Sequence, residues 1–271
     1  MSPIDSKPAS GSPGRSVVYD VVLKSDVGKV RTENQDFGLT TTPEELDPSR
    51  GILMIVADGM GGHRGGATAS RLAATTIRTV FLERGTAGDA TQALVEAVQE
   101  ANARVFGESQ SNTQLRGMGT TATSLLVHGD KATWAHVGDS RLYRMRDGAL
   151  EQLTDDHSLV ATMVREGLLT NEEAAVHPRR NVLQRSLGVA ADIDIDRKDG
   201  IDVLPGDTFL LSSDGLHGFV AADAIREALS LPVRQAADRC IELAHAAGAP
   251  DNVTVVICRA AGGRPGDHPG S

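Results

Sequence analysis

Aromatic residues and cysteines are scarce in this chain of 271 residues. Only 3% of the residues are aromatic, so we expect a core built from Ala, Val, Leu and Ile. The two cysteines, Cys240 and Cys258, stand far apart and lack the spacing of metal ligands. They are therefore interpreted as small core residues of a protein from a reducing compartment.

Excess basic charge and long apolar runs are missing as well. The formal net charge is −9, and no basic stretch is interleaved with aromatic residues, which argues against a general nucleic-acid binder. No apolar run approaches the roughly 18 residues that a membrane-spanning helix needs, and we expect no signal peptide. We therefore expect a cytoplasmic protein without a membrane span.

The composition changes only at the two ends of the chain. Residues 1–15 and 261–271 are rich in Ser, Pro and Gly, which is typical of flexible tails. The residues between them show no long linker and no repeat of fixed period. The sequence predicts one domain, residues 16–260.

The first half of that domain alternates strands with helices. Apolar runs predict strands at 17–23, 37–42 and 52–57, the last two forming an antiparallel pair joined by the polar loop 43–50. Apolar residues at helical spacing then predict two helices, the first following the glycines after Asp58 and the second capped by Asp89. Their predicted buried faces carry Ala69, Ala73, Ile77 and Val80, and Leu94, Val98, Ala101 and Val105.

Short strands dominate the second half. They are predicted at 121–127, 132–137, 141–146, 149–153, 201–204, 208–212 and 253–258. The pair Asp147-Gly148 is a strong signal for a hairpin turn. Residues 158–187 interrupt the strands with a helix-like stretch and a polar loop, and a helix is predicted over 232–247. Helices segregated from antiparallel strands predict an α+β layered fold.

Aspartates stand next to the ends of the predicted strands. Asp58, Asp139 and Asp214 each follow an apolar run, whereas Asp36 and Asp251 each precede one. If the two groups of strands run antiparallel, all these carboxylates meet at one rim. Like charges so close repel each other by about 4 kcal/mol per pair at surface-like dielectric. The pattern therefore indicates a site for a hard divalent cation.

The glycines after Asp58 are open to more than one interpretation. The spacing of the dinucleotide-binding fingerprint fails because Arg64 stands at the third glycine position, and no Gly-Lys-Ser/Thr follows as in a P-loop. What remains is a carboxylate followed by backbone, including Gly59, that can approach a ligand closely. The alternative is a tight strand-to-helix turn capped by Asp58.

Two further residues are candidates for contact with an anion. Arg31 could grip a phosphate through its guanidinium or form a surface ion pair with Glu33 or Asp26. His63 could be a general acid or a polar residue that opens a helix.

The order of several motifs resembles that of bacterial PP2C-type metal-dependent protein phosphatases. The matching segments are 25–36, 58–63 (Asp-Gly-Met-Gly-Gly-His), 118–121 (Met-Gly-Thr-Thr), 137–141 (Val-Gly-Asp-Ser-Arg), 153–158, 213–215 (Ser-Asp-Gly) and 250–254 (Pro-Asp-Asn-Val-Thr). The resemblance extends over roughly residues 16–260. It implies a four-layer α-β-β-α sandwich, in which two antiparallel sheets are flanked by helices and a metal centre lies at one end.

The resemblance also implies roles for the aspartates. Asp58 would bridge two Mn²⁺ or Mg²⁺ ions, and Gly59 would lend its carbonyl to one of them. Asp214 and Asp251 would bind the other ion. Asp36 would help to hold the centre, partly through water.

Other parts of the site follow from the same resemblance. Asp139, with Asp214, matches a third metal position, and Arg31 matches the phosphate-binding arginine. Residues 158–187 correspond to a variable flap beside the active site. Gln35 replaces the glutamate common in the family and could still bind metal or orient water. Met60 stands where eukaryotic relatives carry the histidine assigned as general acid, and His63 is close but not equivalent.

The function implied is the hydrolysis of phosphoserine and phosphothreonine in proteins. A hydroxide bridging the two ions would attack phosphorus, so that no nucleophilic Cys or Ser is needed. We expect a monomer whose partners are phosphorylated proteins, including a Ser/Thr kinase and its substrates. The alternatives are a catalytically inactive PP2C-like regulator and a hydrolase of small phosphate esters. The first would have lost one of the aspartates, and the second would need an aromatic cluster to stack a base.

Overall fold

The computed structural model describes residues 17–41, 51–84 and 89–261, without the side chains of residues 62–64. The predicted loop 43–50 lies outside the described residues. So do the two predicted tails, apart from Ala261, which is the last residue of a strand.

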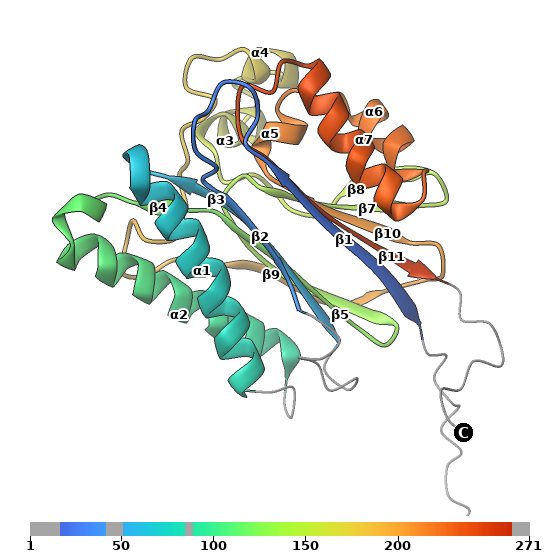
Figure 1. Cartoon of the computed structure of the whole chain (residues 1–271), viewed down its shortest axis with the longest axis horizontal. Helices are drawn as coiled ribbons and strands as arrows, with labels where there is room; N and C mark the ends of the chain where they lie inside the picture. The colour runs from blue at the N-terminus through green and yellow to red at the C-terminus, as the bar shows by residue number, and fades with distance from the viewer. Residues whose placement is uncertain (1–16, 42–50, 85–88, 262–271) are drawn as a thin grey trace, which may run out of the picture.

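Two antiparallel sheets form the centre of the molecule (Figure 1). The first sheet has the order β1 (Val18–Asp26), β11 (Val253–Ala261), β10 (Thr208–Ser212), β7 (Arg141–Arg146) and β8 (Ala149–Gln152). The second has the order β2 (Asp36–Thr40), β3 (Ile52–Met60), β5 (Ala122–His128), β6 (Lys131–Val137) and β9 (Asp196–Asp202), and β4 (Gly119–Thr120) pairs with β3.

Helices cover the outer face of each sheet (Figure 1). The long helices α1 (Gly62–Arg84) and α2 (Ala90–Ser111) lie on the second sheet, and α6 (Ala222–Leu229) and α7 (Val233–Ala246) lie on the first. The short helices α3 (Leu159–Arg165), α4 (Asn171–Ala175) and α5 (Asp214–His217) gather at one end of the sandwich, and a 3₁₀ turn (Thr113–Leu115) follows α2. The predicted four-layer α-β-β-α sandwich is confirmed.

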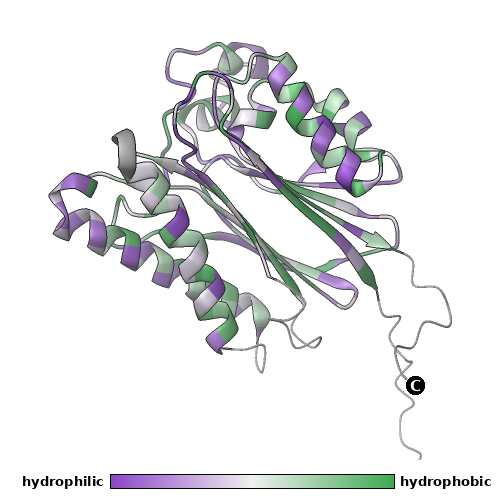
Figure 2. Ribbon diagram, in the orientation of Figure 1, coloured by the Kyte–Doolittle hydropathy of each residue, from purple (hydrophilic) through white to green (hydrophobic). Residues whose placement is uncertain are grey.

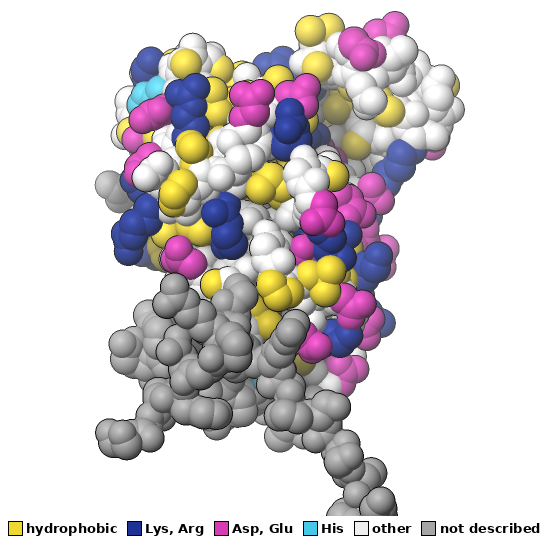
Figure 3. All heavy atoms as spheres, turned by 90° about the vertical axis from the view of Figure 1, so that its right-hand side faces the viewer, with side chains coloured by type: hydrophobic (Ala, Val, Ile, Leu, Met, Phe, Trp, Pro, Cys, Tyr) yellow, Lys and Arg dark blue, Asp and Glu magenta, His cyan; other side chains and the backbone are white. Residues whose placement is uncertain are grey.

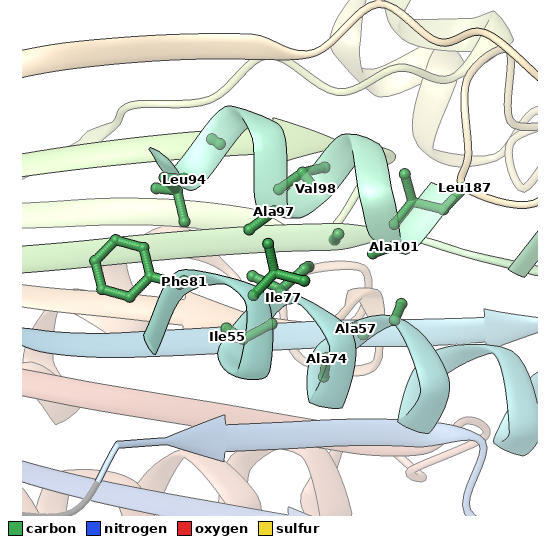
Figure 4. Packing of buried hydrophobic residues seen from close by; sticks show 14 of the residues in the cluster. Ile55, Ala57, Ala74, Ile77, Phe81, Leu94, Ala97, Val98, Ala101 and Leu187 are labelled. Carbon is green, nitrogen blue, oxygen red and sulfur yellow. The ribbon is translucent and has the colours of Figure 1, made fainter. Parts of the chain in front are cut away.

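Each interface between layers has its own hydrophobic core. The cluster between α1, α2 and the second sheet includes Ile55, Ile77, Phe81 and Val98, all fully buried (Figure 4). Small alanines from both helices fill the space between these larger side chains, which lets the helices lie close to the sheet. The predicted buried faces of both helices are thereby confirmed.

Two further clusters hold the remaining layers together. Met54 and Leu125 meet Phe209 and Val256 between the two sheets, and α7 packs through Cys240 onto the outer face of the first sheet. The strands are accordingly mostly hydrophobic, whereas α2 and α7 alternate hydrophobic and hydrophilic residues (Figure 2). Since few aromatic residues are available, branched aliphatic residues and alanine supply most of this buried surface.

Local signals in the sequence are realised at several element boundaries. The side chain of Asp89 caps α2 by accepting from the backbone N–H of Thr91 at 2.9 Å. Asp147 and Gly148 both have positive φ, 50° and 78°, as the two-residue turn between β7 and β8 requires. The predicted strands at 141–146 and 208–212 agree with β7 and β10 residue for residue.

Other boundaries differ from the prediction. Strand β3 does not end at Ala57 but continues to Met60, because β4 pairs with Gly59 and Met60. The strand predicted at 201–204 is β9, which begins five residues earlier, at Asp196. Its charged residues are exposed on a sheet edge, so they gave no apolar signal. Helices α5 and α6 were not predicted, because each has eight residues or fewer and neither has a side-chain cap.

The surface is mixed in charge where Figure 3 shows it. On this face Lys and Arg side chains are interspersed with Asp and Glu, and no large patch of one sign stands out among the described residues. None of the helices in the described residues has the length and apolarity needed to cross a bilayer.

Candidate metal centre

The antiparallel arrangement brings the predicted aspartates to one end of the sandwich. Asp36, the first residue of β2, lies directly opposite Asp58 of β3 in the register of the two strands. Asp139 follows the end of β6, Asp214 begins α5 after β10, and Asp251 stands two residues before β11. Strands that end in Asp thus run against strands that begin with it, as the sequence predicted.

A hollow of about 420 Å³ lies among these residues. Its walls include seven of the nine residues predicted for the site: Arg31, Gln35, Asp58, Gly59, Asp139, Asp214 and Asp251. Most of the other lining residues are polar as well, and no aromatic side chain is among them. The hollow therefore suits a charged ligand and offers no surface for stacking a base.

Asp36 is placed behind the wall of this hollow, not on it. Its side chain is 7% exposed, and its Oδ2 accepts a hydrogen bond from the Ser213 hydroxyl at 2.6 Å. The same hydroxyl oxygen accepts from the backbone N–H of Thr254 at 2.9 Å. Asp36 thus connects the two sheets immediately beneath the hollow.

The backbone around Asp58 is fixed on both sides. Its N–H donates to the hydroxyl of Thr121 at 2.8 Å, and its carbonyl accepts from the hydroxyl of Thr120 at 2.9 Å. Next to it, a Cβ on Gly59 would lie 2.1 Å from the carbonyl oxygen of Gly66. Only glycine fits here, so that the start of α1 can pass directly over the end of β3.

Asp251 and Arg31 are joined across the hollow. Arg31 Nη2 donates to Asp251 Oδ2 at 2.7 Å, and this hydrogen bond raises the pKa of the guanidinium. The predicted alternative ion pairs of Arg31, with Glu33 or Asp26, are not formed. Arg31 remains half exposed, with its guanidinium at the rim where Asp214 and Asp58 are close enough to act on it electrostatically.

Burial and mutual repulsion make the carboxylates weak acids. Removal from water, followed by the nearby Asp214, raises the pKa of Asp139 to about 8. Burial likewise raises the pKa of Asp36 to about 7 and that of Asp214 to about 6. For Asp58 burial, together with the charges of Asp36 and Asp214, raises the pKa well above its usual value. Negative charge is therefore costly in this hollow unless a cation compensates it.

The kinds of atoms present fit a hard divalent cation. Carboxylate oxygens and the backbone carbonyl of Gly59 are the ligands that Mg²⁺ and Mn²⁺ prefer. Within the described residues, however, no three His, Cys, Asp or Glu side chains are arranged as a ready-made site. Asp251 is bound to Arg31 and Asp36 to Ser213, so both carboxylates are engaged by groups of the protein itself. The ligand assignments stay predictions.

Of the other residues predicted for the site, Gln35 lines the hollow, whereas the side chain of His63 is not described. The backbone carbonyl of Gln35 accepts from Gly59 N–H at 3.1 Å and from the Ser70 hydroxyl at 2.6 Å. His63 lies in the first turn of α1. Arg141, in the same motif as Asp139, holds Asp156 through two hydrogen bonds of 2.8 and 2.7 Å.

Two residues that build the site, Asn252 and Ser213, stand in the matching motifs but were given no role by the sequence. The Asn252 side chain accepts from Gln35 N–H at 2.8 Å and donates to the carbonyls of Val27 and Glu33 at 2.9 and 3.0 Å. It thereby fastens the loop that carries Arg31 to the start of β11. Ser213 does the same for Asp36. An Asn or Ser beside a turn is too common to be singled out without its distant partners.

Comparison with known proteins gives a consistent picture. A family model described as Protein phosphatase 2C matches residues 31–245. The serine/threonine phosphatase stp of Listeria monocytogenes is 36% identical over 243 residues, which are 87% of this chain and 93% of that protein. The serine/threonine protein phosphatase PstP of Mycobacterium tuberculosis is 38% identical over 244 residues, 89% of this chain but only 45% of that protein.

A solved structure shares the fold as well. The crystal structure of the catalytic domain of the serine/threonine protein phosphatase PstP in complex with two manganese ions superposes with a TM-score of 0.78. It is 36% identical, and the match covers 91% of this chain and 100% of that one.

Proposed function

The chain belongs to the protein phosphatase 2C family, and from this premise we propose that it removes phosphate from phosphoserine and phosphothreonine in proteins, with Mn²⁺ or Mg²⁺ as cofactor. One observation carries most of the proposal. Five aspartates gather at one end of the sandwich, and four of them line a polar hollow. Burial, together with repulsion between neighbouring carboxylates, raises the pKa values of Asp36, Asp58, Asp139 and Asp214, so a bound cation would stabilise their charged forms.

The residues of the hollow would divide the work of holding two ions. Asp58 and the carbonyl of Gly59 would bind one ion, with Asp58 shared by the second ion, which Asp214 and Asp251 complete. Asp36 would stabilise the centre from below. Asp139 and Asp214 could hold a third. Bound ions would supply a water molecule of lowered pKa as the nucleophile.

The chain's own groups would bind and orient the phosphate. Arg31 is the natural partner for its oxygens, because a guanidinium matches a phosphate with two parallel hydrogen bonds. If Asp251 served as a metal ligand, Arg31 would lose its present partner and be available to the substrate. Asn252 keeps the Arg31 loop in place during this exchange.

The proposal also includes the bounds of the phosphatase unit, its location and its partners. We place the phosphatase unit at residues 16–260 and the flap at 158–187, and we expect a cytoplasmic monomer that opposes a Ser/Thr kinase. The Listeria relative, of nearly equal length, is named as a serine/threonine phosphatase. An inactive regulator is the competing function, but every aspartate expected of an active enzyme is present.

Release of phosphate from a phosphothreonine peptide tests the proposal. We expect turnover only with Mn²⁺ or Mg²⁺, and a loss of about a thousandfold in Asp214→Ala. Asp223→Ala is the matched control, because the side chain of Asp223 is 88% exposed on α6 and lines neither this hollow nor its neighbour. Folded protein that releases no phosphate at any metal concentration would favour the inactive regulator.

A further inference from the structure

A second hollow, of about 470 Å³, adjoins the metal centre. Asp139, Asn181 and Asp214 line both hollows, so the two are continuous. One wall of the second hollow comes from helices α3 and α4 of the 158–187 segment, and another from β7, β8 and the end of α5. In Figure 1 these short helices lie together at one end of the sandwich, beside the ends of the strands that carry the aspartates.

The wall formed by the 158–187 segment is fixed before any ligand arrives. Ser158 caps α3, and Thr170 and Glu173 form a reciprocal capping box on α4. The segment is tied down at its far end, where the N–H of Gln184 donates to the carbonyl of His157 at 2.8 Å. A preformed wall needs little ordering when it binds a chain, which favours affinity.

Part of the lining of the second hollow is apolar. Val160 and Val164 of α3 and Phe219, beyond α5, contribute hydrophobic surface. Phe219 is 38% exposed, so a large part of this ring has no partner inside the molecule. An apolar surface next to a phosphate site suits an uncharged side chain that neighbours the phosphorylated residue.

Two arginines without a carboxylate partner in the described part of the chain, Arg165 and Arg180, also line this hollow. Arg165 donates only to the Thr162 hydroxyl at 3.1 Å, and neither it nor Arg180 forms an ion pair with an acidic side chain of the described residues. Arg141, on the opposite wall, is already neutralised by Asp156. The unpaired arginines of the lining thus belong to the 158–187 segment, whereas its aspartates, Asp139, Asp155, Asp156 and Asp214, all lie outside that segment.

We propose that this second hollow binds the part of a substrate protein that flanks the phosphorylated residue, and that Arg165 and Arg180 select substrates with an acidic side chain there. The inference rests on the proposed phosphatase function and specifies its substrate class. Because the second hollow is continuous with the metal centre, its occupant is the polypeptide that carries the phosphate. Charge complementarity determines its composition, with an apolar residue over Phe219 and a carboxylate facing α3.

A set of matched peptides tests the inference. Glu or Gln is placed in turn at each of the positions on either side of one phosphothreonine, and kcat/KM is measured with Mn²⁺. We expect one or two positions at which wild-type enzyme prefers Glu by about threefold to tenfold, the range of a partly exposed charge pair. In Arg165→Glu the preference should reverse at those positions, and in Arg165→Gln it should disappear.

Arg179→Glu is the matched control for total charge. Arg179 is an exposed neighbour in the same segment and lines neither hollow, so this variant should keep the preference for Glu. Equal loss of preference in both charge reversals would overturn the inference, because the effect would then be long-range. Absence of any preference in wild-type enzyme would overturn it too.

Hydrolysis of p-nitrophenyl phosphate separates this inference from the proposed function. This small ester reaches the metal centre without occupying the second hollow. If it is hydrolysed with Mn²⁺ but no peptide preference is found, the docking inference fails and the phosphatase stands. If neither ester nor peptides are hydrolysed by folded protein, the proposed function fails and the docking inference with it.

Discussion

An aspartate stands at each end of strand β10, and the two differ in their charged neighbours. At one end Asp207, 1% exposed, is held by Arg146 through hydrogen bonds of 2.7 and 2.6 Å and accepts a third from Leu204 N–H at 2.8 Å. At the other end Asp214 lies with Asp58 and Asp139, and raised pKa values result. Arg31 brings a cation to that end but is bound to Asp251, and Arg141, whose charge acts on Asp139, is bound to Asp156.

The difference shows how a structural carboxylate can be told from one that awaits a ligand. Burying a charge is costly unless it is paired. At the Asp207 end the protein supplies the partner itself, and the ion pair joins the hairpin β7–β8 to the turn before β10. At the Asp214 end several carboxylates share too little positive charge. Such a cluster persists because a cation from solution compensates it, which is what the proposed function requires.

Among the changes that test this difference between the two ends of β10, we expect Asp58→Ala to have the largest effect. We expect metal-dependent phosphatase activity to fall by about a thousandfold or more, because the variant loses the residue that we propose is shared by the two ions. The metal-free fold should be retained or slightly stabilised, since a repelling carboxylate is removed. Phosphate release and thermal unfolding with and without Mn²⁺ measure the two effects. Near-normal turnover would contradict the bridging role.

Removing the cation at the other end should have the reverse effect. Arg146→Ala leaves the Asp207 carboxylate buried without its partner. We expect a loss of about 2–3 kcal/mol in the free energy of unfolding, less than for a fully buried pair because Arg146 is partly exposed. At temperatures where the variant is folded, kcat should be nearly unchanged. Urea unfolding and kcat, measured on the same sample, test this division between stability and function.

A smaller effect on activity is expected from substitution of Arg31, the arginine that lines the hollow with the aspartates. Arg31→Ala should raise KM for phosphopeptides by about tenfold, with a lesser change in kcat, because one charge-assisted contact to phosphate is lost. Arg31→Lys should restore part of the affinity, since it keeps the charge but not the two-pronged geometry. An unchanged KM in Arg31→Ala would remove the anion-binding role.

The smallest effect is expected from a change of pH, which alters the protonation of the aspartates at the Asp214 end without any substitution. In the metal-free protein the pKa values of Asp36, Asp214 and Asp139 are raised to about 7, 6 and 8, so the folded state binds protons more tightly than the unfolded chain. The stability that these groups contribute is present below the unfolded pKa of about 4 and is lost as pH rises toward 8.

Thermal unfolding of the metal-free protein checks this sign. The contribution of the cluster predicts a melting temperature a few degrees lower at pH 8.5 than at pH 5.5. Mn²⁺ should stabilise the protein much more at pH 8.5, because at pH 5.5 the metal competes with bound protons. Asp58→Ala should show a smaller pH dependence. Equal stabilisation by Mn²⁺ at both pH values would contradict the coupling between protons and metal.

The sequence was most informative where an element depends on its own residues. The apolar runs of β7 and β10, the Asp89 cap of α2 and the Asp147-Gly148 turn were all predicted correctly. Strand β9 was largely missed, because an edge strand can carry charged residues on both faces and loses the apolar alternation. Helices α5 and α6 were missed because tertiary packing, not local propensity, stabilises them.

The position of the aspartates was determined by the sequence alone. Acidic residues stand at the ends of strands whose directions alternate, so their meeting at one end follows from antiparallel pairing. At Gly59 the sequence predicted close approach to a ligand, whereas the neighbour that the structure shows there is the backbone of Gly66 in α1.

Only the tertiary structure decided how these residues are held and neutralised. Asp36 proved to lie behind the hollow, on the hydroxyl of Ser213, which is 177 residues away in the chain. Arg31 was found to meet Asp251, 220 residues away, and Asn252 to fasten its loop. Hydrogen bonds act over about 3 Å and are indifferent to distance along the chain. A sequence can therefore reveal which groups need a partner, whereas the packing of the two sheets determines which partner each one finds.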